Sequence, residues 1–175
     1  MQLNKTRATA LMFALIAPLS IAPLSHADEP LGRVYTTIAE QPVSAKDREV
    51  ADLFDRWNAA LKTGDSQKVA ALYAPDAILQ PTVSNEVRTT PESISDYFDH
   101  FLANKPVGQI NYRLIRHMGA DSAMDSGVYT FNLTAADGST RRVQARYSFI
   151  YERVNGEWKI INHHSSAMPQ VHAAL

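Results

Sequence analysis

The chain has 175 residues, with 17 basic and 18 acidic side chains and a formal net charge of −1. This near-neutral balance offers no basic surface for nucleic acid or for an anionic membrane. Cysteine is absent, which excludes disulfide bonds, a thiolate nucleophile and a zinc site built from cysteines.

Residues 1–27 have the pattern of a secretory signal peptide. Lys5 and Arg7 precede an apolar stretch, and small residues stand before a predicted cleavage after Ala27. Prolines interrupt the apolar stretch, so it is poorly suited to span a bilayer, and an uncleaved anchor is the less favoured alternative. We therefore expect a periplasmic or secreted protein without membrane association after cleavage. Cleavage leaves about 148 residues, enough for one domain.

The mature chain is predicted to contain a leader or linker (28–43), one folded domain (44–169) and a short C-terminal tail (170–175). A helix is expected to begin at Ser44, because this residue opens a sequence that resembles a capping box. Apolar residues then recur at helical spacing and predict one buried stripe. Its members are Val50, Leu53, Phe54, Trp57 and Leu61.

Shorter elements follow this helix. Asp65 or Ser66 caps a second helix, which carries Leu72 and Tyr73 and ends before a proline. The segment 77–84 predicts a short strand that Pro81 interrupts. A third helix then begins at a threonine followed by proline, 90-TP-91, a pair typical of a helix start.

The second half of the domain has the alternation of β-strands. Strands are predicted at 109–118, 122–135, 140–154 and 157–167, and Asp-Gly and Asn-Gly pairs between them favour tight hairpins. Helices followed by such a meander predict an α+β fold, with three N-terminal helices packed on a strongly bent antiparallel sheet. A sheet bent in this way would form a cone with an internal pocket.

The stretch 162-NHHSS-166 places histidines and serines near the end of the last predicted strand. Successive side chains of a strand point to opposite faces, so His164 and Ser166 share a face with Trp158. We favour this face as the inner one, although a single β-bulge would reverse the assignment. From spacing alone, ordinary polar residues in solvent are the more favoured interpretation. The opposite face carries Lys159, Ile161, His163 and Ser165.

A metal site has weak support in the sequence. Adjacent His163 and His164 cannot both bind one ion from a straight strand, and a zinc site needs three or four ligands. The other histidines of the mature chain, His100, His117 and His172, show no supporting spacing. No metal ligand is therefore predicted.

Several segments of the sequence resemble a known protein family. The segments 145-ARYSFIYERVN-155 and 156-GEWKIINHHSSAMP-169 are similar to the association domain of calcium/calmodulin-dependent protein kinase II, one of the nuclear transport factor 2-like cone folds. The chain is more specifically similar to the iota-class carbonic anhydrases, the exported bacterial branch of that superfamily. This likeness extends over 53-LFDRWNAAL-61, 73-YAPDAILQPTVSN-85, 96-DYFDHFL-102, 127-GVYTFNL-133 and 162-NHHSSAMP-169. The family commonly has a third histidine where this chain has Asn162.

The resemblance implies reversible hydration of carbon dioxide to bicarbonate. It implies a site lined by Thr82, Tyr97, His164 and Ser166, in which hydroxyls hold the substrate and the histidine moves a proton. No cofactor is predicted, while zinc or manganese stays an alternative because the family includes metal-dependent members. A homodimer formed through the sheet is expected. The positions expected to bind substrate are His163 and Ser165.

Other interpretations stay open. From composition and periodicity alone, Thr82 is better explained as a strand residue bonded to backbone, and Tyr97 as a core aromatic. The whole domain is also explained as a non-enzymatic module for ligand binding or oligomerisation, like the kinase association domain itself. An isomerase or polyketide cyclase would need a buried carboxylate base. Since Asp55 and Asp96 are predicted on polar helix faces, this interpretation ranks last.

Overall fold

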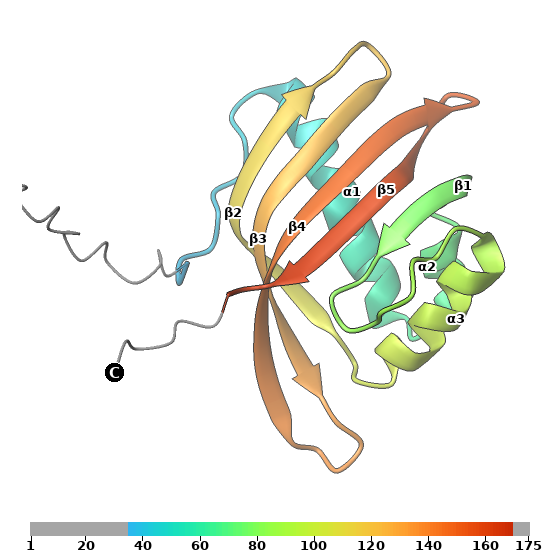
Figure 1. Ribbon diagram of the computed structural model, residues 1–175. Helices are drawn as coiled ribbons and strands as arrows, with labels where there is room; N and C mark the ends of the chain where they lie inside the picture. The colour runs from blue at the N-terminus through green and yellow to red at the C-terminus, as the bar shows by residue number, and fades with distance from the viewer. Residues whose placement is uncertain (1–34, 170–175) are drawn as a thin grey trace, which may run out of the picture. The chain divides into compact units, whose positions relative to one another are not determined.

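The computed structural model describes residues 35–169 (Figure 1). The predicted signal peptide (1–27), the leader as far as residue 34 and the tail (170–175) lie outside the described residues. No helix in the described part is long and apolar enough to cross a membrane. The elements are α1 (Ala45–Lys62), α2 (Ser66–Ala70), β1 (Tyr73–Gln80), α3 (Pro91–Leu102), β2 (Val107–His117), β3 (Ser122–Thr134), β4 (Thr140–Val154) and β5 (Glu157–Ala167).

Helix α1 begins as its sequence predicts. The Ser44 side chain accepts a hydrogen bond from the Asp47 backbone N–H at 3.0 Å, which satisfies one of the free donors of the first turn. Gly64, with φ of +71°, follows the last turn in the left-handed conformation that glycine adopts most easily. The predicted apolar stripe is buried in full. Its buried residues are Val50, Ala51, Leu53, Phe54, Trp57 and Leu61.

The boundary between α2 and β1 differs from the prediction. Helix α2 ends at Ala70, and Tyr73 begins β1 instead of extending the helix. Tyr73 pairs with Ile160 of β5, and the Ile160 backbone N–H donates to the Leu72 carbonyl at 2.9 Å. Pairing with a strand about ninety residues away in sequence thus overrides the local helical spacing. The strand ends before Pro81, which has no N–H to donate to the ladder.

Helix α3 also begins as predicted. Thr90 is its N-cap, and its side chain and that of Ser93 form a reciprocal capping box. Pro91 occupies the first turn, where its missing N–H costs nothing. Ile94 and Phe98 are fully buried, which turns the apolar side of α3 toward the rest of the domain.

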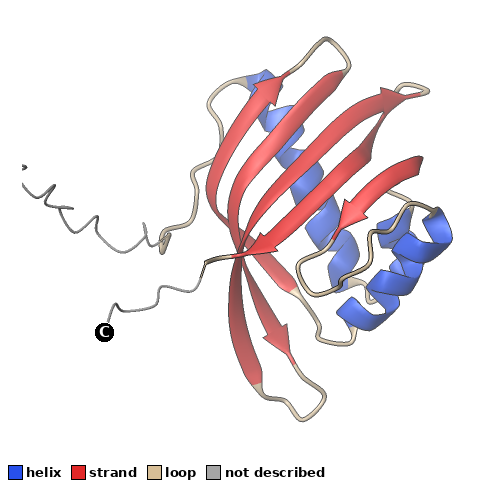
Figure 2. Ribbon diagram, viewed as in Figure 1, coloured by secondary structure: helices blue, strands red, loops and turns tan. Residues whose placement is uncertain are grey.

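The sheet has the strand order β1-β5-β4-β3-β2 (Figure 2). The four predicted C-terminal strands are present as an antiparallel meander. Strand β1, however, pairs with β5 in parallel, so the sheet is mixed and the expected purely antiparallel sheet is wrong in this respect. The predicted α+β fold, three helices packed against this bent sheet, is confirmed (Figure 1). The hairpin glycines Gly138 and Gly156 both have positive φ, as tight turns require.

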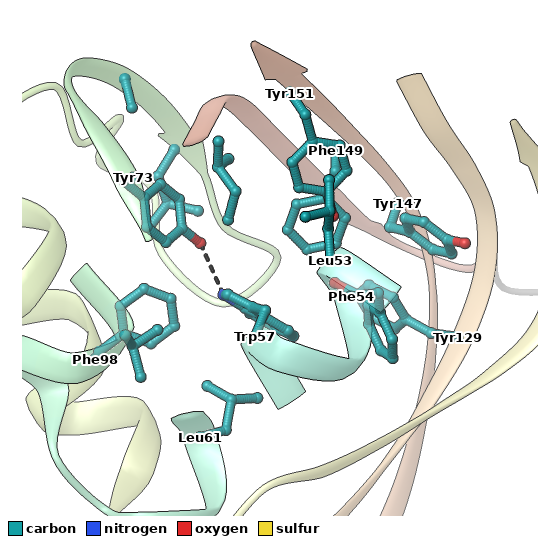
Figure 3. Packing of buried hydrophobic residues seen from close by; sticks show 14 of the residues in the cluster. Leu53, Phe54, Trp57, Leu61, Tyr73, Phe98, Tyr129, Tyr147, Phe149 and Tyr151 are labelled. Carbon is teal, nitrogen blue, oxygen red and sulfur yellow. Dashed lines mark hydrogen bonds between the residues drawn. The ribbon is translucent and has the colours of Figure 1, made fainter. Parts of the chain in front are cut away.

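The core between α1 and the sheet is rich in aromatic side chains (Figure 3). Trp57 is 2 % exposed and lies edge-on to Phe149, with ring centroids 5.3 Å apart. Phe54 packs against Tyr147 at 6.2 Å, and tilted or edge-on pairs of this kind contribute about 1 kcal/mol beyond the burial of their area. The core therefore fixes α1 firmly on the inner face of β3 and β4.

A β-bulge in β5 decides which side chains face inward. Tyr151 pairs with Ile160 while its neighbour Ile150 pairs with Asn162, so Ile161 is an extra residue. The bulge shifts the alternation by one position, and every side chain beyond it changes face. Trp158 and Ile160 point to the helix side as predicted, but the next inward residues are odd-numbered.

The prediction that His164 and Ser166 face inward is therefore wrong. His163 is 4 % exposed and Ser165 is 8 % exposed, whereas His164 is exposed and Ser166 is half-buried on the outer face. The histidines and serines do lie in the last strand, as predicted, but the odd-numbered residues of this segment face inward instead of the even-numbered ones.

Candidate functional site

A small cavity of about 70 Å³ lies between the inner face of the sheet, α3 and the loop that follows β1. Its volume has room for only a few non-hydrogen atoms. Most of the wall is aromatic or aliphatic. The lining residues are Trp57, Leu79, Pro81, Thr82, Val83, Tyr97, Phe98, Phe101, Tyr129, Phe131, Leu133, Arg141, Val143, Ala145, His163 and Ser165.

Three hydroxyl groups meet at this cavity from three separate segments. Ser165 of β5 accepts a hydrogen bond from the Tyr129 hydroxyl of β3, and it shares a second hydrogen bond with Thr82 Oγ1 from the loop after β1. Burial raises the pKa of Tyr129, so its hydroxyl keeps its proton at neutral pH and acts as a donor. Ser165 and Thr82 can both donate and accept. The arrangement is a short chain of hydroxyls along one wall of the cavity.

His163 lies beside these hydroxyls and is held by a second chain of hydrogen bonds. Trp57 Nε1–H donates to the Tyr73 hydroxyl oxygen at 3.1 Å (Figure 3), and the Tyr73 oxygen lies 2.9 Å from His163 Nδ1. Tyr73 has no other acceptor for its proton within the described residues. Because its oxygen accepts from Trp57, its O–H donates to Nδ1. His163 therefore carries its own proton on Nε2.

The protonation state of His163 follows from its surroundings. Burial lowers the pKa of His163 from about 6.5 to about 3, and the neighbouring His164 adds to this shift. The imidazole is therefore neutral at physiological pH. Its Nε2 is buried and has no hydrogen-bond partner in residues 35–169. A buried N–H without a partner is costly, so this imidazole is held in place at an energetic cost.

Tyr97 closes the α3 side of the cavity. Its ring stacks on that of Phe101, with centroids 5.8 Å apart and planes at 14°. Its hydroxyl makes no hydrogen bond to any described residue. Burial raises the pKa of Tyr97 well above its ordinary value, so this hydroxyl also stays protonated. It is a further donor available to a molecule in the cavity.

The structure brings together Thr82, Tyr97, His163 and Ser165 from the predicted set. It does not bring His164 and Ser166 to them, because these residues lie on the opposite face of β5. There they line a separate depression of about 510 Å³ together with Tyr35, Ser148 and Arg146.

Sequence reasoning missed Tyr129 and Tyr73 as parts of this site. Tyr129 alternates with Phe131 and Leu133 in β3, and this pattern could have identified it as an inward residue. Tyr73 gave no such signal, since its spacing from Val69 is equally typical of a helix.

A metal ion does not fit this cavity. The described part of the chain contains no group of three histidine or acidic side chains close enough to hold one. The lining provides one imidazole and no carboxylate, whereas zinc and manganese sites use several such ligands.

Asp125 is a buried carboxylate that the sequence did not predict. It is 0 % exposed, accepts a hydrogen bond from the Tyr147 hydroxyl at 2.8 Å, and pairs with Arg113 at 3.1 Å. Burial raises the pKa of Asp125 to about 6, against the opposing effect of Arg113. Asp125 does not line the small cavity, so the cavity has no carboxylate base of the kind an isomerase or cyclase would need.

This order of elements, with a cavity between helices and a bent sheet, is that of the nuclear transport factor 2-like class. The structure of such a protein from Salmonella enterica is similar over 71% of this chain and 92% of its own, at 16% identity and a TM-score of 0.62. A candidate scytalone dehydratase from Novosphingobium aromaticivorans covers 74% of this chain and 89% of its own, at 12% identity and a TM-score of 0.64. These two likenesses show the fold alone, in a class that includes enzymes.

The chain belongs to the calcium/calmodulin dependent protein kinase II association domain family, whose model matches residues 46–169. A structure from Xanthomonas campestris, described as a candidate member of the same family, is 58% identical. It covers 80% of this chain and 100% of its own, with a TM-score of 0.79. No curated protein matches the chain.

Proposed function

We propose that the small cavity binds carbon dioxide and bicarbonate, and that the protein interconverts them as a carbonic anhydrase. One observation carries the proposal: the hydroxyl chain of Thr82, Ser165 and Tyr129 and the side chain of His163 line the same small, mostly apolar cavity. The size of the cavity restricts the ligand to a few non-hydrogen atoms, which suits either molecule.

The polarity of the cavity suits both sides of the reaction. Carbon dioxide has no charge, and the rings of Trp57 and Phe101 offer it an apolar wall. Bicarbonate carries its charge on trigonal oxygens. These oxygens can accept from the hydroxyls of Ser165 and Tyr97. Donors fixed where negative charge develops lower a reaction barrier, by about 3 kcal/mol for a well-placed one.

The proton balance follows from the same groups. Hydration forms a bond between the substrate carbon and a water-derived oxygen, leaves the negative charge on the oxygens of bicarbonate and releases one proton. His163 is neutral with its proton on Nε2, and burial keeps Tyr97 and Tyr129 protonated. None of these groups takes up a proton at neutral pH. Water therefore loses its proton to solvent before the step, and the hydroxide so formed attacks the carbon of carbon dioxide. This gives bicarbonate with no further proton to release.

The test is a stopped-flow assay of carbon dioxide hydration on chelator-treated protein, with Ser165→Ala and Ser166→Ala as a matched pair. We expect Ser165→Ala to lower kcat/KM by about a hundredfold, since it removes the central group of the hydroxyl chain. Ser166→Ala changes a neighbour on the other face and should stay within about twofold. A wild-type protein that is inactive both without metal and with added zinc or manganese would end the proposal.

A second candidate function is the assembly of subunits, because the family that the chain belongs to is named for association. Leu114 is 58 % exposed beside the outer depression that holds His164 and Ser166, and this face could pair with a second copy through the sheet. Mass measurement in solution separates the two candidates. Loss of a homodimer on Leu114→Glu, with no turnover in the wild type, favours assembly.

The proposed location is the periplasm or the exterior of the cell, where the reaction would act on exported or external carbon dioxide. It rests on the signal-peptide pattern of residues 1–27. Cleavage after Ala27 is checked by the mass of the mature protein.

A further inference from the structure

A second pocket of about 320 Å³ adjoins the small cavity. Both spaces have the side chains of Tyr97, Phe101 and Leu133 in their walls, and Val83 and Arg141 also contact both. The two spaces therefore share part of their walls, and we call the second one the outer pocket. Its remaining lining residues are Ser84, Arg88, His100 and Asn104.

The outer pocket contains two guanidinium groups with different surroundings. Arg88 is mostly buried, with a side chain 13% exposed, and it pairs with Asp96 at 2.8 Å and with Glu86 at 3.3 Å. Two carboxylates thus offset its charge and fix its position. Arg141 forms no ion pair and no side-chain hydrogen bond with any residue in the range 35–169. It is the guanidinium of the outer pocket that can bind an incoming anion.

The position of Arg141 is set by the strand on which it lies. Arg141 pairs with Leu133 across the β3–β4 ladder, and Val143 two residues further also lines the small cavity. Alternation along β4 turns Arg142 to the opposite face. The two adjacent arginines therefore lie on opposite faces of the sheet, and of the two only Arg141 lines the small cavity and the outer pocket.

A guanidinium group suits a small trigonal anion. Its planar fork of N–H donors matches two oxygens of a planar oxyanion, and it carries its charge at every physiological pH. Bicarbonate and nitrate share this oxygen geometry. We propose that the outer pocket is an anion entrance in which Arg141 binds bicarbonate, or a similar trigonal oxyanion, on its way to or from the small cavity.

The test uses nitrate as the probe, because it has the required shape and charge and does not react. Nitrate is titrated into purified protein, and binding is followed through the backbone amide signals of Val83 and Leu133. We expect saturable binding in the wild type and a dissociation constant raised about fivefold or more in Arg141→Gln. Arg142→Gln removes the same charge from the other face and should change it by less than about twofold.

Three results would overturn this inference: no saturable binding to the wild type, no weakening in Arg141→Gln, or equal weakening in both variants. Equal weakening would mean that only net charge matters. Because both residues lie at exposed positions, neither substitution is expected to unfold the domain.

The inference rests on the proposed function for the identity of its anion, but the two can fail separately. The hydration assay is run on the same preparations. Nitrate binding that depends on Arg141 in a protein without hydration activity removes the carbonic anhydrase proposal and leaves the entrance in place. If the protein is active and nitrate inhibits Arg141→Gln as strongly as the wild type, the anion entrance is wrong and the carbonic anhydrase proposal stands.

Discussion

Ser165 and Ser166 are neighbours in β5, yet the first completes the hydroxyl chain of the small cavity and the second lies on the opposite face of the sheet. The extra residue Ile161 determines which serine points inward. His163 and His164 form a second pair of this kind. In each pair, the residue on the outer face is a control for substitution of the identical residue on the inner face.

The first prediction concerns the proton of His163. Tyr73→Phe removes the O–H that donates to Nδ1, so nothing keeps the imidazole proton on Nε2. We expect ¹⁵N spectra of labelled wild-type protein at pH 7 to show a single Nε2–H tautomer. Spectra of Tyr73→Phe should show a mixture. The variant should also lose about 1–3 kcal/mol of stability, because Trp57 Nε1–H becomes unpaired.

Tyr97→Phe is the control for this experiment. Its hydroxyl does not contact His163, so the tautomer should be unchanged. A wild-type imidazole protonated on Nδ1 would contradict the hydrogen-bond directions given above.

The second prediction concerns stability in acid. Since the pKa of His163 is about 3 in the folded protein and near 6.5 when unfolded, only the unfolded chain holds this proton between those values. Stability is therefore complete above about pH 6.5. It falls as the pH is lowered toward 3, by about 1.4 kcal/mol per pH unit. His163 should thus contribute a loss of about 2 kcal/mol between pH 7.5 and pH 5, measured by urea unfolding.

His163→Phe isolates this effect, because it keeps a ring of similar size and removes the titration. Asp125, with a pKa raised to about 6, contributes in the opposite direction, but it does so equally in both proteins. The difference in unfolding free energy between wild type and variant should therefore change with pH. A difference that stays constant between pH 7.5 and pH 5 would mean that His163 is not held neutral.

The third prediction concerns the dependence of turnover on pH. If hydroxide is the attacking species, the hydration rate should rise steadily from pH 6 to pH 9, with no inflection near pH 6.5. His163→Gln should lower the hydration rate at every pH without changing the shape of the pH profile. His164→Gln should leave the rate and the profile nearly unchanged. An inflection near neutral pH that disappears in His163→Gln would instead identify this residue as a proton acceptor.

The fourth prediction concerns Gly127, which pairs with Arg113 of β2, close to a second β-bulge between Ile110 and Tyr112. A Cβ atom on Gly127 would lie 1.9 Å from the Tyr112 carbonyl oxygen, which is backbone and cannot turn away. Gly127→Ala should therefore destabilise the protein by about 2 kcal/mol or more. Gly119→Ala, with nothing within 4 Å of its new atom, should stay within about 0.5 kcal/mol in the same urea unfolding measurement.

Much of the fold follows from local chemistry that the sequence displays. Ser44 and Thr90 start helices because their side chains bond to the first free N–H groups, and Gly138 and Gly156 mark hairpins because they adopt positive φ. The strands of the meander follow from their alternation. These features depend on near neighbours along the chain, so a pattern is sufficient to find them.

The features that the sequence did not reveal depend on distant partners. The bulge at Ile161 lies where β5 pairs with β4 on one side and with β1 on the other. No residue type at that position of the sequence indicates a bulge. Tyr73 leaves the helical pattern because Ile160 is available to pair with it. Thr82 and Tyr97 lie outside β5 and line the cavity, whereas the bulge turns His163 and Ser165 inward in place of His164 and Ser166.

The parallel pairing of β1 with β5 also affects how the protein folds during its synthesis on the ribosome. Thr82 belongs to the early part of the domain, and its partner Ser165 emerges 83 residues later. Helices α1 and α3 can form while synthesis continues, but the wall of the small cavity is completed only when β5 is added. A nascent chain stalled before His163 would thus contain the three helices and most of the sheet and still lack the wall of the cavity that β5 provides.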